Sequence, residues 1–313
     1  DESGARRDIQ LKGSGPTLFS RMGDGRASVG PVIREYLVSE GMAALQIPTT
    51  RSLAMVTTGE LIARERMEPG AILTRVASSH IRVGTFQYFY GQKDDAAIRL
   101  LADYSINRHY PNAGENSNPY VEFLRSVVEK TAELISSWML VGFIHGVMNT
   151  DNCSIAGETI DYGPCAFVDN FHPGKVFSSI DRHGRYAWGK QPEIAHWNLL
   201  QLAQCLLPLH PGSTEDARGE FETVLNEFPG TFARVYEEGF SRKLGLLDPH
   251  PGDLDLARDI LTLLAEQEID FTLFFVVGNL LECYNCHAEF RGMEHLGEFQ
   301  AFNLDCLLYT SPS

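Results

Sequence analysis

The sequence of 313 residues contains no uninterrupted apolar run of the ~18–20 residues that a membrane-spanning helix requires, so we expect no membrane partner. Its longest apolar stretches, Trp138–Ile144 and Phe271–Val277, have the length of a buried helix or strand segment. The first residues, Asp-Glu-Ser-Gly-Ala-Arg-Arg, lack the apolar core of a secretory signal peptide. We therefore expect a cytoplasmic protein in a bacterium, or a mitochondrial one in a eukaryote, although a chain that starts in mid-pattern can have lost a targeting segment.

Basic residues are also scarce. Lys and Arg together number 26 against 41 Asp and Glu, which gives a formal net charge of -15. A surface of this sign repels nucleic acid and anionic bilayers, so we expect neither as a partner, and any phosphate site must be local. The basic side chains that could form such a site, or could equally be solvated surface charges, are Lys12, Arg21, Arg26, Arg75 and Arg82.

The six cysteines form no disulfide framework, which favours a reducing compartment. Cys283 and Cys286 are the one close pair, and only Cys306 follows them. A structural zinc site would need a second pair at suitable spacing. We therefore interpret this pair as incidental.

What is present is a globular composition, with 43% hydrophobic and 21% charged residues, in a chain long enough for one large or two modest domains. Its first part is predicted to form a strand, a glycine-rich turn, a helix and two strands, over residues 8–13, 22–26, 31–46, 53–58 and 71–77, with a break at 68–70. This order is typical of a small α+β lobe.

From Asp94 onward the spacing of apolar residues becomes helical. The helix-like segments are residues 96–104, 119–147, 194–207, 215–228, 230–243 and 254–267. The one strand-like island in this half, residues 153–168, contains the candidate chemistry. The predicted architecture is therefore α+β and bilobal, with an N-lobe over residues 1–92, a mainly helical C-lobe over 93–275 and a divergent tail over 276–313.

Four residue types that serve kinase-type phosphoryl transfer occur in the expected chain order. Such enzymes use a strand Lys at the phosphates, a helix Glu that orients it, and an Asn and an Asp that hold Mg²⁺. Here these are Lys12, Glu35, Asn152 and Asp161. Each alone is weak evidence, because a strand Lys or a helix Glu is usually a surface charge and Asp-Tyr-Gly is often only a turn. Their order favours an ATP-using phosphoryl- or nucleotidyl-transferring enzyme.

The segment His145-Gly-Val147 departs from the kinase pattern. Small-molecule kinases have His-Gly-Asp there, with an Asn seven residues after the His, and Asn152 follows His145 at that spacing. Val147 stands where the Asp would accept the hydroxyl proton, and a valine cannot accept one. Either the protein is catalytically inactive or another carboxylate is the base. Asp151 is the available one, with a loop-capping role as its alternative.

Several longer blocks carry a resemblance to a known family. They occur in the family's order between about Asp8 and Phe275: Leu11-Lys-Gly-Ser-Gly, Ser20-Arg-Met-Gly-Asp-Gly-Arg-Ala, Ile33-Arg-Glu-Tyr-Leu-Val-Ser-Glu, Ile47-Pro-Thr-Thr-Arg, Arg75-Val-Ala-Ser-Ser-His-Ile-Arg-Val-Gly, His145-Gly-Val-Met-Asn-Thr-Asp-Asn, Thr159-Ile-Asp-Tyr-Gly-Pro, and Gly184-Arg-Tyr-Ala with Gln191-Pro. By these blocks the chain resembles the selenoprotein O family, protein adenylyltransferases with a protein-kinase-like fold.

The resemblance implies that ATP binds in the reverse orientation to that in a kinase, so that AMP passes to Ser, Thr or Tyr hydroxyls of protein substrates. It implies nucleotide-binding roles for Lys12 with its partner Glu35, and for Asp24, Gly25, Arg75, Arg82 and Asp161. It implies Asn152 and Asp161 as Mg²⁺ ligands and Asp151 as the proton acceptor. Guanidinium groups suit phosphate oxygens, whereas a purely structural Arg75 would need a buried acid partner.

The alternatives to AMP transfer are UMP transfer from UTP with Mn²⁺, a kinase, and a nucleotide-binding pseudokinase scaffold. The family also has a further N-terminal portion with another Gly-Asp-Gly-Arg loop, so the N-lobe is expected to be incomplete. Residues after Phe275 do not resemble the family's continuation, so Cys283, Cys286 and Cys306 receive no family roles. The sequence gives no indication of oligomeric state.

Overall fold

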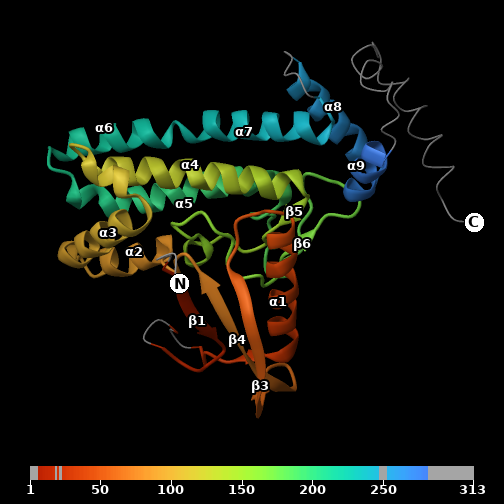
Figure 1. The fold of residues 1–313 in the computed structure, drawn as a ribbon, viewed down its shortest axis with the longest axis horizontal. Helices are drawn as coiled ribbons and strands as arrows, with labels where there is room; N and C mark the ends of the chain where they lie inside the picture. Colours follow the sequence, from red (N-terminus) through yellow and green to blue (C-terminus); the bar gives the residue numbers. More distant parts are fainter. Residues whose placement is uncertain (1–5, 18–19, 21–22, 247–251, 281–313) are drawn as a thin grey trace, which may run out of the picture.

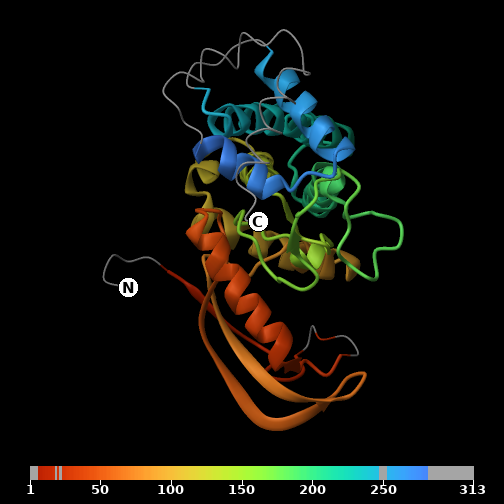
Figure 2. The same ribbon diagram turned by 90° about the vertical axis from the view of Figure 1, so that its right-hand side faces the viewer.

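The computed structural model describes residues 6–17, 20, 23–246 and 252–280, and for 277–280 the backbone alone. The described chain is α+β, as predicted: an antiparallel sheet with one long helix lies on one side of a larger, helical part (Figure 1). The two parts are also distinct in the view at right angles (Figure 2).

The sheet is built around the central strand β4, Met67–Ala77. Strand β3, Arg51–Ala63, pairs along one edge, and the short strands β1, Asp8–Lys12, and β2, Ala27–Ser28, pair along the other. Alternate residues of β4 are buried, which places every second side chain on one face.

Helix α1, Val29–Ala44, covers that face. Its buried residues Val32, Glu35, Ser39 and Met42 recur at the three- and four-residue spacing of one helical stripe. The stripe thus carries a carboxylate, Glu35, into the interior between helix and sheet.

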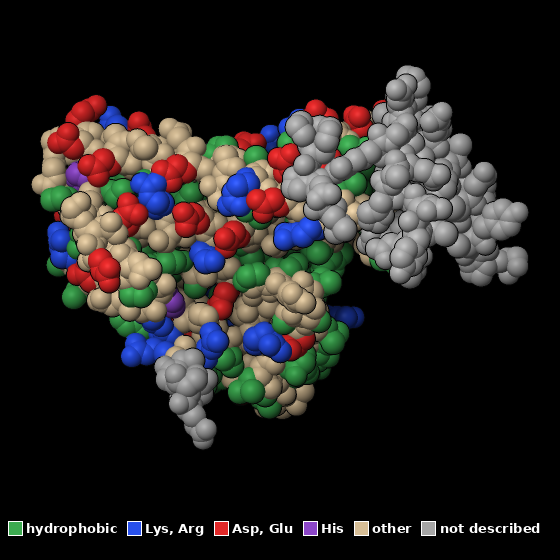
Figure 3. Space-filling model, turned by 45° about the horizontal axis from the view of Figure 1, so that its top comes forward, with side chains coloured by type: hydrophobic (Ala, Val, Ile, Leu, Met, Phe, Trp, Pro, Cys, Tyr) green, Lys and Arg blue, Asp and Glu red, His purple; other side chains and the backbone are tan. Residues whose placement is uncertain are grey.

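The helical part is organised around α4, Pro119–Leu140, which contacts α5, α6 and α7. The other helices are α2 Val83–Gly91, α3 Asp95–His109, α5 Gln191–Leu206, α6 Thr214–Leu225, α7 Phe228–Lys243, α8 Asp253–Glu266 and α9 Phe271–Leu280. Short 3-10 helices are η1 Pro111–Glu115, η2 Thr150–Asn152, η3 Trp188–Lys190 and η4 Leu207–Leu209. Acidic side chains are spread over this part with Lys and Arg between them (Figure 3). Within the described ranges, no helix is both long enough and apolar enough to cross a bilayer.

The helix predicted over residues 119–147 is wrong at its C-terminal end, because α4 ends at Leu140. Gly142 has a φ of 70°, and a Cβ there would lie 2.9 Å from the ring of Phe271. The chain then enters strand β5, Phe143–Ile144, which pairs with β6, Ala166–Phe167. The apolar run that sustained the helical pattern is therefore shared by a helix and a strand.

Two further predictions are corrected. The strand-like island over residues 153–168 contains only β6; its apolar side chains are buried in the helical core, while the backbone pairs at isolated bridges such as Thr49 with Thr159. The break predicted at residues 68–70 lies inside β4, and the hairpin turns at residues 64–66. Pro69 is accommodated next to an irregularity in the register of β3. Helix α2 was not predicted.

Candidate nucleotide and metal site

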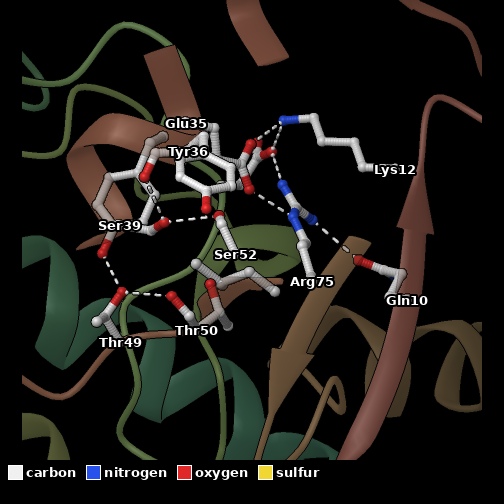
Figure 4. A network of polar contacts seen from close by, with 12 residues as sticks. Gln10, Lys12, Glu35, Tyr36, Ser39, Thr49, Thr50, Ser52 and Arg75 are labelled. Atoms are coloured by element: carbon white, nitrogen blue, oxygen red, sulfur yellow. Dashed lines mark hydrogen bonds and ion pairs between the residues drawn. The ribbon is translucent and has the colours of Figure 1, made fainter. Parts of the chain in front are cut away.

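A cluster of buried and half-buried charges joins the sheet to the helical part. Lys12 Nζ donates to Glu35 Oε2 at 2.6 Å and also to Asp161 Oδ1. Arg75 donates from Nε to the second Glu35 oxygen and from Nη2 to Asp161 Oδ1 at 2.7 Å. In Figure 4, Lys12 and Arg75 extend from neighbouring strands toward Glu35 on α1. Two cations and two carboxylates therefore meet at one point.

Both carboxylates of the cluster are ionised. Burial alone would raise the pKa of Glu35, which is 1% exposed, but the charges of Arg75 and Lys12 outweigh it and lower that pKa. The pKa of Asp161 is lowered in the same way, against burial, by Lys12 and Arg75. Asp161 also has a φ of 71°, a strained conformation that persists only when the surroundings hold it and that is frequent at functional sites.

Arg75 has in Glu35 the buried acid partner that a structural role requires. Its side chain is 4% exposed, and besides Glu35 and Asp161 it donates from Nη1 to Gln10 Oε1 at 2.9 Å. Gln10 pairs with Arg75 across β1 and β4, so its side chain lies on the same face. The structure thus shows Arg75 holding the two acids together, and its phosphate contact stays a prediction.

His145 holds its own segment, which leads to Asp151 and Asn152, beside the segment that contains Asp161. Its ring is fully buried, which lowers its pKa and keeps it neutral. Nδ1 accepts from the Val147 amide at 3.3 Å, so Nε2 carries the proton and donates to the Ile160 carbonyl at 2.9 Å. Together with the β5–β6 pairing, this bond holds the His145 segment beside the residue before Asp161.

Asp151 and Asn152 lie in η2. Asn149 caps this turn, and its Oδ1 accepts from the Asp151 amide at 3.0 Å. The Asn152 side chain donates from Nδ2 to the Val147 carbonyl at 3.0 Å. That bond assigns the amide nitrogen to the protein and leaves the Asn152 oxygen as the atom that can bind a cation.

Arg82 is the residue that precedes helix α2. Burial lowers its pKa, as does the charge of Arg75, while the carboxylates of Asp161 and Asp151 act in the opposite direction. Its Nε is buried and has no hydrogen-bond partner among the described residues. Because a buried cationic donor without an acceptor is costly, this atom suits an anionic ligand.

Comparison with known proteins decides the family. Residues 1–293 match the family described as protein adenylyltransferase SelO. The chain belongs to this family. Relatives called protein nucleotidyltransferase YdiU include those of Rhodopseudomonas palustris strain BisB18, 59% identical over 275 residues, and Agrobacterium fabrum, 56% identical over 294 residues. That of Methylorubrum extorquens is 61% identical over 270 residues.

These alignments cover 88%, 94% and 86% of this chain but only 56%, 60% and 54% of the respective relatives. The chain therefore spans somewhat more than half the length of the curated SelO-family relatives it matches. The resemblance predicted from sequence motifs is confirmed, and the matched range reaches residue 293, beyond Phe275.

The two metal ligands predicted for this SelO-family chain fit Mg²⁺ by their donor atoms. An amide oxygen from Asn152 and a carboxylate from Asp161 are hard oxygen ligands, which Mg²⁺ prefers. Within the described ranges no group of three or more His, Cys, Asp or Glu side chains could hold a metal ion. Mg²⁺ usually takes one or two protein ligands and completes its shell with phosphates and water.

Asp24 and Gly25 are not part of the buried cluster. Asp24 pairs with Arg64, at the turn between β3 and β4, at 2.8 Å. On the other side, Arg26 forms an isolated bridge with Ser14, so the Asp24 loop runs beside the end of β1, which is Lys12. Gly25, with a φ of 63°, packs against Gly15, whose carbonyl a Cβ would meet at 2.1 Å. Nucleotide contacts by both residues stay predictions.

Sequence reasoning gave no role to three residues that shape the site. Gln10 could have been found, because it alternates with Lys12 on one strand face. Gln191, at the start of α5, accepts from the His145 amide and donates to the Phe143 carbonyl; the sequence placed it in a family block but gave it no role. Gly84 lies against Asp151, a contact between segments distant in sequence.

The cysteines contribute no reactive thiol to the described site. Burial raises the pKa of Cys153 and Cys205 to about 12 and that of Cys165 to about 11, so these free thiols stay protonated. The cysteine pair interpreted above as incidental lies outside the described residues, and so does the cysteine that follows it: Cys283, Cys286 and Cys306.

Proposed function

We propose that this chain is the catalytic core of a nucleotidyltransferase that moves AMP from ATP to Ser, Thr or Tyr hydroxyls of proteins, on a bilobal protein-kinase-like fold. The observation that carries the proposal is the junction of Lys12, Glu35 and Asp161, which joins strand, helix and loop at one charged site. The description of the family supports AMP as the transferred group, and the relatives' name supports proteins as acceptors.

In the proposed reaction the acceptor hydroxyl oxygen bonds to the α-phosphorus of ATP, and the bond from that phosphorus to the bridging oxygen breaks. Pyrophosphate leaves with the bonding electrons, and the hydroxyl proton passes to Asp151. Lys12, positioned by Glu35, binds phosphate oxygens, and Arg82 supplies its unpartnered donor to the departing phosphates. Val147 cannot take the proton, which argues against the kinase arrangement.

Asn152 and Asp161 would hold the Mg²⁺ that accompanies the nucleotide. When bound, the ion neutralises phosphate charge as it does in other phosphoryl-transfer sites. Lys12 and Arg75 both bond to Asp161 Oδ1, which keeps this carboxylate charged and leaves its other oxygen for the cation.

Transfer of label distinguishes this function from its alternatives. Incubation with α-labelled and γ-labelled ATP should modify protein from the α position only; label from γ alone would identify a kinase. Asp161→Ala should abolish metal-dependent nucleotide binding, whereas Asp151→Ala should bind nucleotide and lose transfer. Equal transfer by wild type and Asp151→Ala would show that the base is another group.

A second function, a nucleotide-binding scaffold without catalysis, is favoured by Val147 alone. ATP binding without transfer of label, in a longer chain that includes any preceding family segment, would support it over the enzyme. Competition between ATP and UTP, with Mg²⁺ and with Mn²⁺, tests UMP as the transferred group in the same assay.

A further inference from the structure

Gly84 lies in the first turn of α2, directly against Asp151. A Cβ built on Gly84 would be 2.2 Å from Asp151 Oδ1 and 3.3 Å from the Asp151 amide nitrogen. No side-chain atom could occupy that position without moving the carboxylate. The space that other residues fill with a Cβ is therefore filled here by the functional group of Asp151.

The two segments are held in this arrangement by their backbones. The amide of Val83 donates to the Cys153 carbonyl at 3.0 Å, and Arg82 forms a bridge with Ser154. On the other side, the Asp151 amide is fixed by Asn149. Because these bonds do not involve the Asp151 carboxylate, they should persist when the carboxylate is displaced.

We propose that Gly84 is a positioning residue for Asp151: its missing side chain lets the carboxylate lie against the first turn of α2, and this contact sets where the proton is accepted. The inference rests on the proposed function, in which Asp151 is the proton acceptor. It assigns Gly84 no contact with nucleotide or metal.

Gly84 has an ordinary helical conformation, so alanine is not strained there by its backbone, and alanine has the higher helix propensity. The atom it would meet most closely is the end of a flexible side chain. Gly84→Ala should therefore rotate the Asp151 carboxylate out of place while the chain still folds.

The matched control is Gly91→Ala at the other end of the same helix, where a Cβ has no neighbour within 4 Å. We expect Gly84→Ala to lower the rate of AMP transfer at saturating ATP between about tenfold and a hundredfold, as small misplacements of catalytic groups do. The dissociation constant for ATP should not change, and Gly91→Ala should match wild type in both. A wild-type rate for Gly84→Ala, or an equal loss in both variants, would overturn the proposal.

A double-mutant cycle separates this proposal from the proposed function. If Gly84 acts through the carboxylate, Gly84→Ala should cause no further loss of transfer when added to Asp151→Ala. The effect of Gly84→Ala on the melting temperature should also be more favourable in the Asp151→Ala background than in wild type, because the clash with the carboxylate is gone. If Asp151→Ala transfers like wild type, the base assignment fails, and the melting cycle still tests the contact. Additive melting effects would overturn the contact itself.

Discussion

At the scale of single residues, a charged side chain is buried in the site only where side chains of opposite charge pair with it. Glu35 lies within the buried stripe of α1, and each of its oxygens accepts from a different cation. An ionised carboxylate could not be placed there alone, because its desolvation would cost several kcal/mol. The role of Glu35 as the partner of Lys12 was predicted from sequence and agrees with the observed ion pair.

Removing this carboxylate should be more harmful than removing the half-buried carboxylate of Glu40 on the same helix. Glu35→Ala leaves Lys12 and Arg75 short of a partner, so the free energy of unfolding in urea should fall by about 3–5 kcal/mol. Glu40→Ala breaks a pair with Arg51, in which the Glu40 and Arg51 side chains are 32% and 58% exposed, and a bond from the Ser52 amide, and should cost about 1–2 kcal/mol. Similar losses in the two variants would contradict the structural role of Glu35.

Arg75 and Arg82 should respond in opposite ways to replacement by methionine. Arg75→Met leaves Lys12 as the one remaining cation for both Glu35 and Asp161, and should lower the free energy of unfolding by about 3 kcal/mol or more. Arg82→Met removes a buried donor that lacks an acceptor, so stability should hold or rise while ATP affinity, measured by calorimetry, falls at least about tenfold. Unchanged affinity in Arg82→Met would exclude its phosphate role.

His80 should make stability depend on pH. Burial and the charges of Arg75 and Arg82 lower its pKa to about 4 in the folded chain, and both ring nitrogens lack partners among the described residues. Since the unfolded chain binds a proton near about pH 6.5, stability should fall as pH decreases from there toward about 4.

Urea unfolding of wild type and His80→Gln at about pH 7.5 and about pH 5 measures this effect of His80. The wild type should lose more stability than His80→Gln between the two pH values. The exposed His183→Gln serves as the control and should behave like wild type. Parallel losses in wild type and His80→Gln would rule the linkage out.

The residues whose roles the sequence left open are those whose partners come from elsewhere in the chain. Lys12 and Glu35 could be paired from strand and helix patterns that are close in sequence. Arg75 has acid partners on α1 and in the Asp161 loop, so no local pattern reveals that it is enclosed. Gly84 is informative only once Asp151 is seen against it, across 67 residues.

At the scale of elements, the periodicity of apolar residues predicted whether a segment is a helix or a strand better than it predicted where the segment begins and ends. The helical stripe of α1 and the strand character of β1 and β4 follow from apolar spacing. Apolar spacing could not locate the end of α4, since a buried helix and a buried strand both continue the apolar run. It also missed α2, whose buried residues are only Val83 and Phe86.

The end of α4 should depend on Gly142. Gly142→Ala places a Cβ in the left-handed region and against Phe271, so the free energy of unfolding should fall by about 1–3 kcal/mol. Gly219→Ala, within α6 and with no atom near its Cβ, should instead be neutral or stabilising by up to about 1 kcal/mol. Thermal unfolding of both variants measures the difference. An equally stable Gly142→Ala would mean that another contact ends the helix.

At the scale of the whole molecule, the charged cluster links the sheet part to the helical part, so we expect a ligand that contacts both parts to stabilise both. Lys12, Glu35 and Arg75 belong to the sheet and α1, whereas Asp161 and Asn152 come from loops of the helical part. Under the proposed function, a nucleotide with Mg²⁺ that contacts both sets should stabilise the folded chain by mass action, by about 2.7 kcal/mol at a concentration of one hundred times the dissociation constant.

The metal-dependent part of that stabilisation tests the proposed nucleotide and metal site without requiring that AMP be transferred. ATP with Mg²⁺ should raise the melting temperature of wild type and of Asp151→Ala more than ATP with EDTA does. Asp161→Ala should lose this increment, because one of two proposed ligands is gone. Asp161→Ala also removes one of the two carboxylates that Lys12 and Arg75 share, leaving Glu35 as their remaining acid partner, and should melt lower on its own. The increment must therefore be compared within each variant, and an Mg²⁺-dependent rise that survives in Asp161→Ala would place the metal elsewhere.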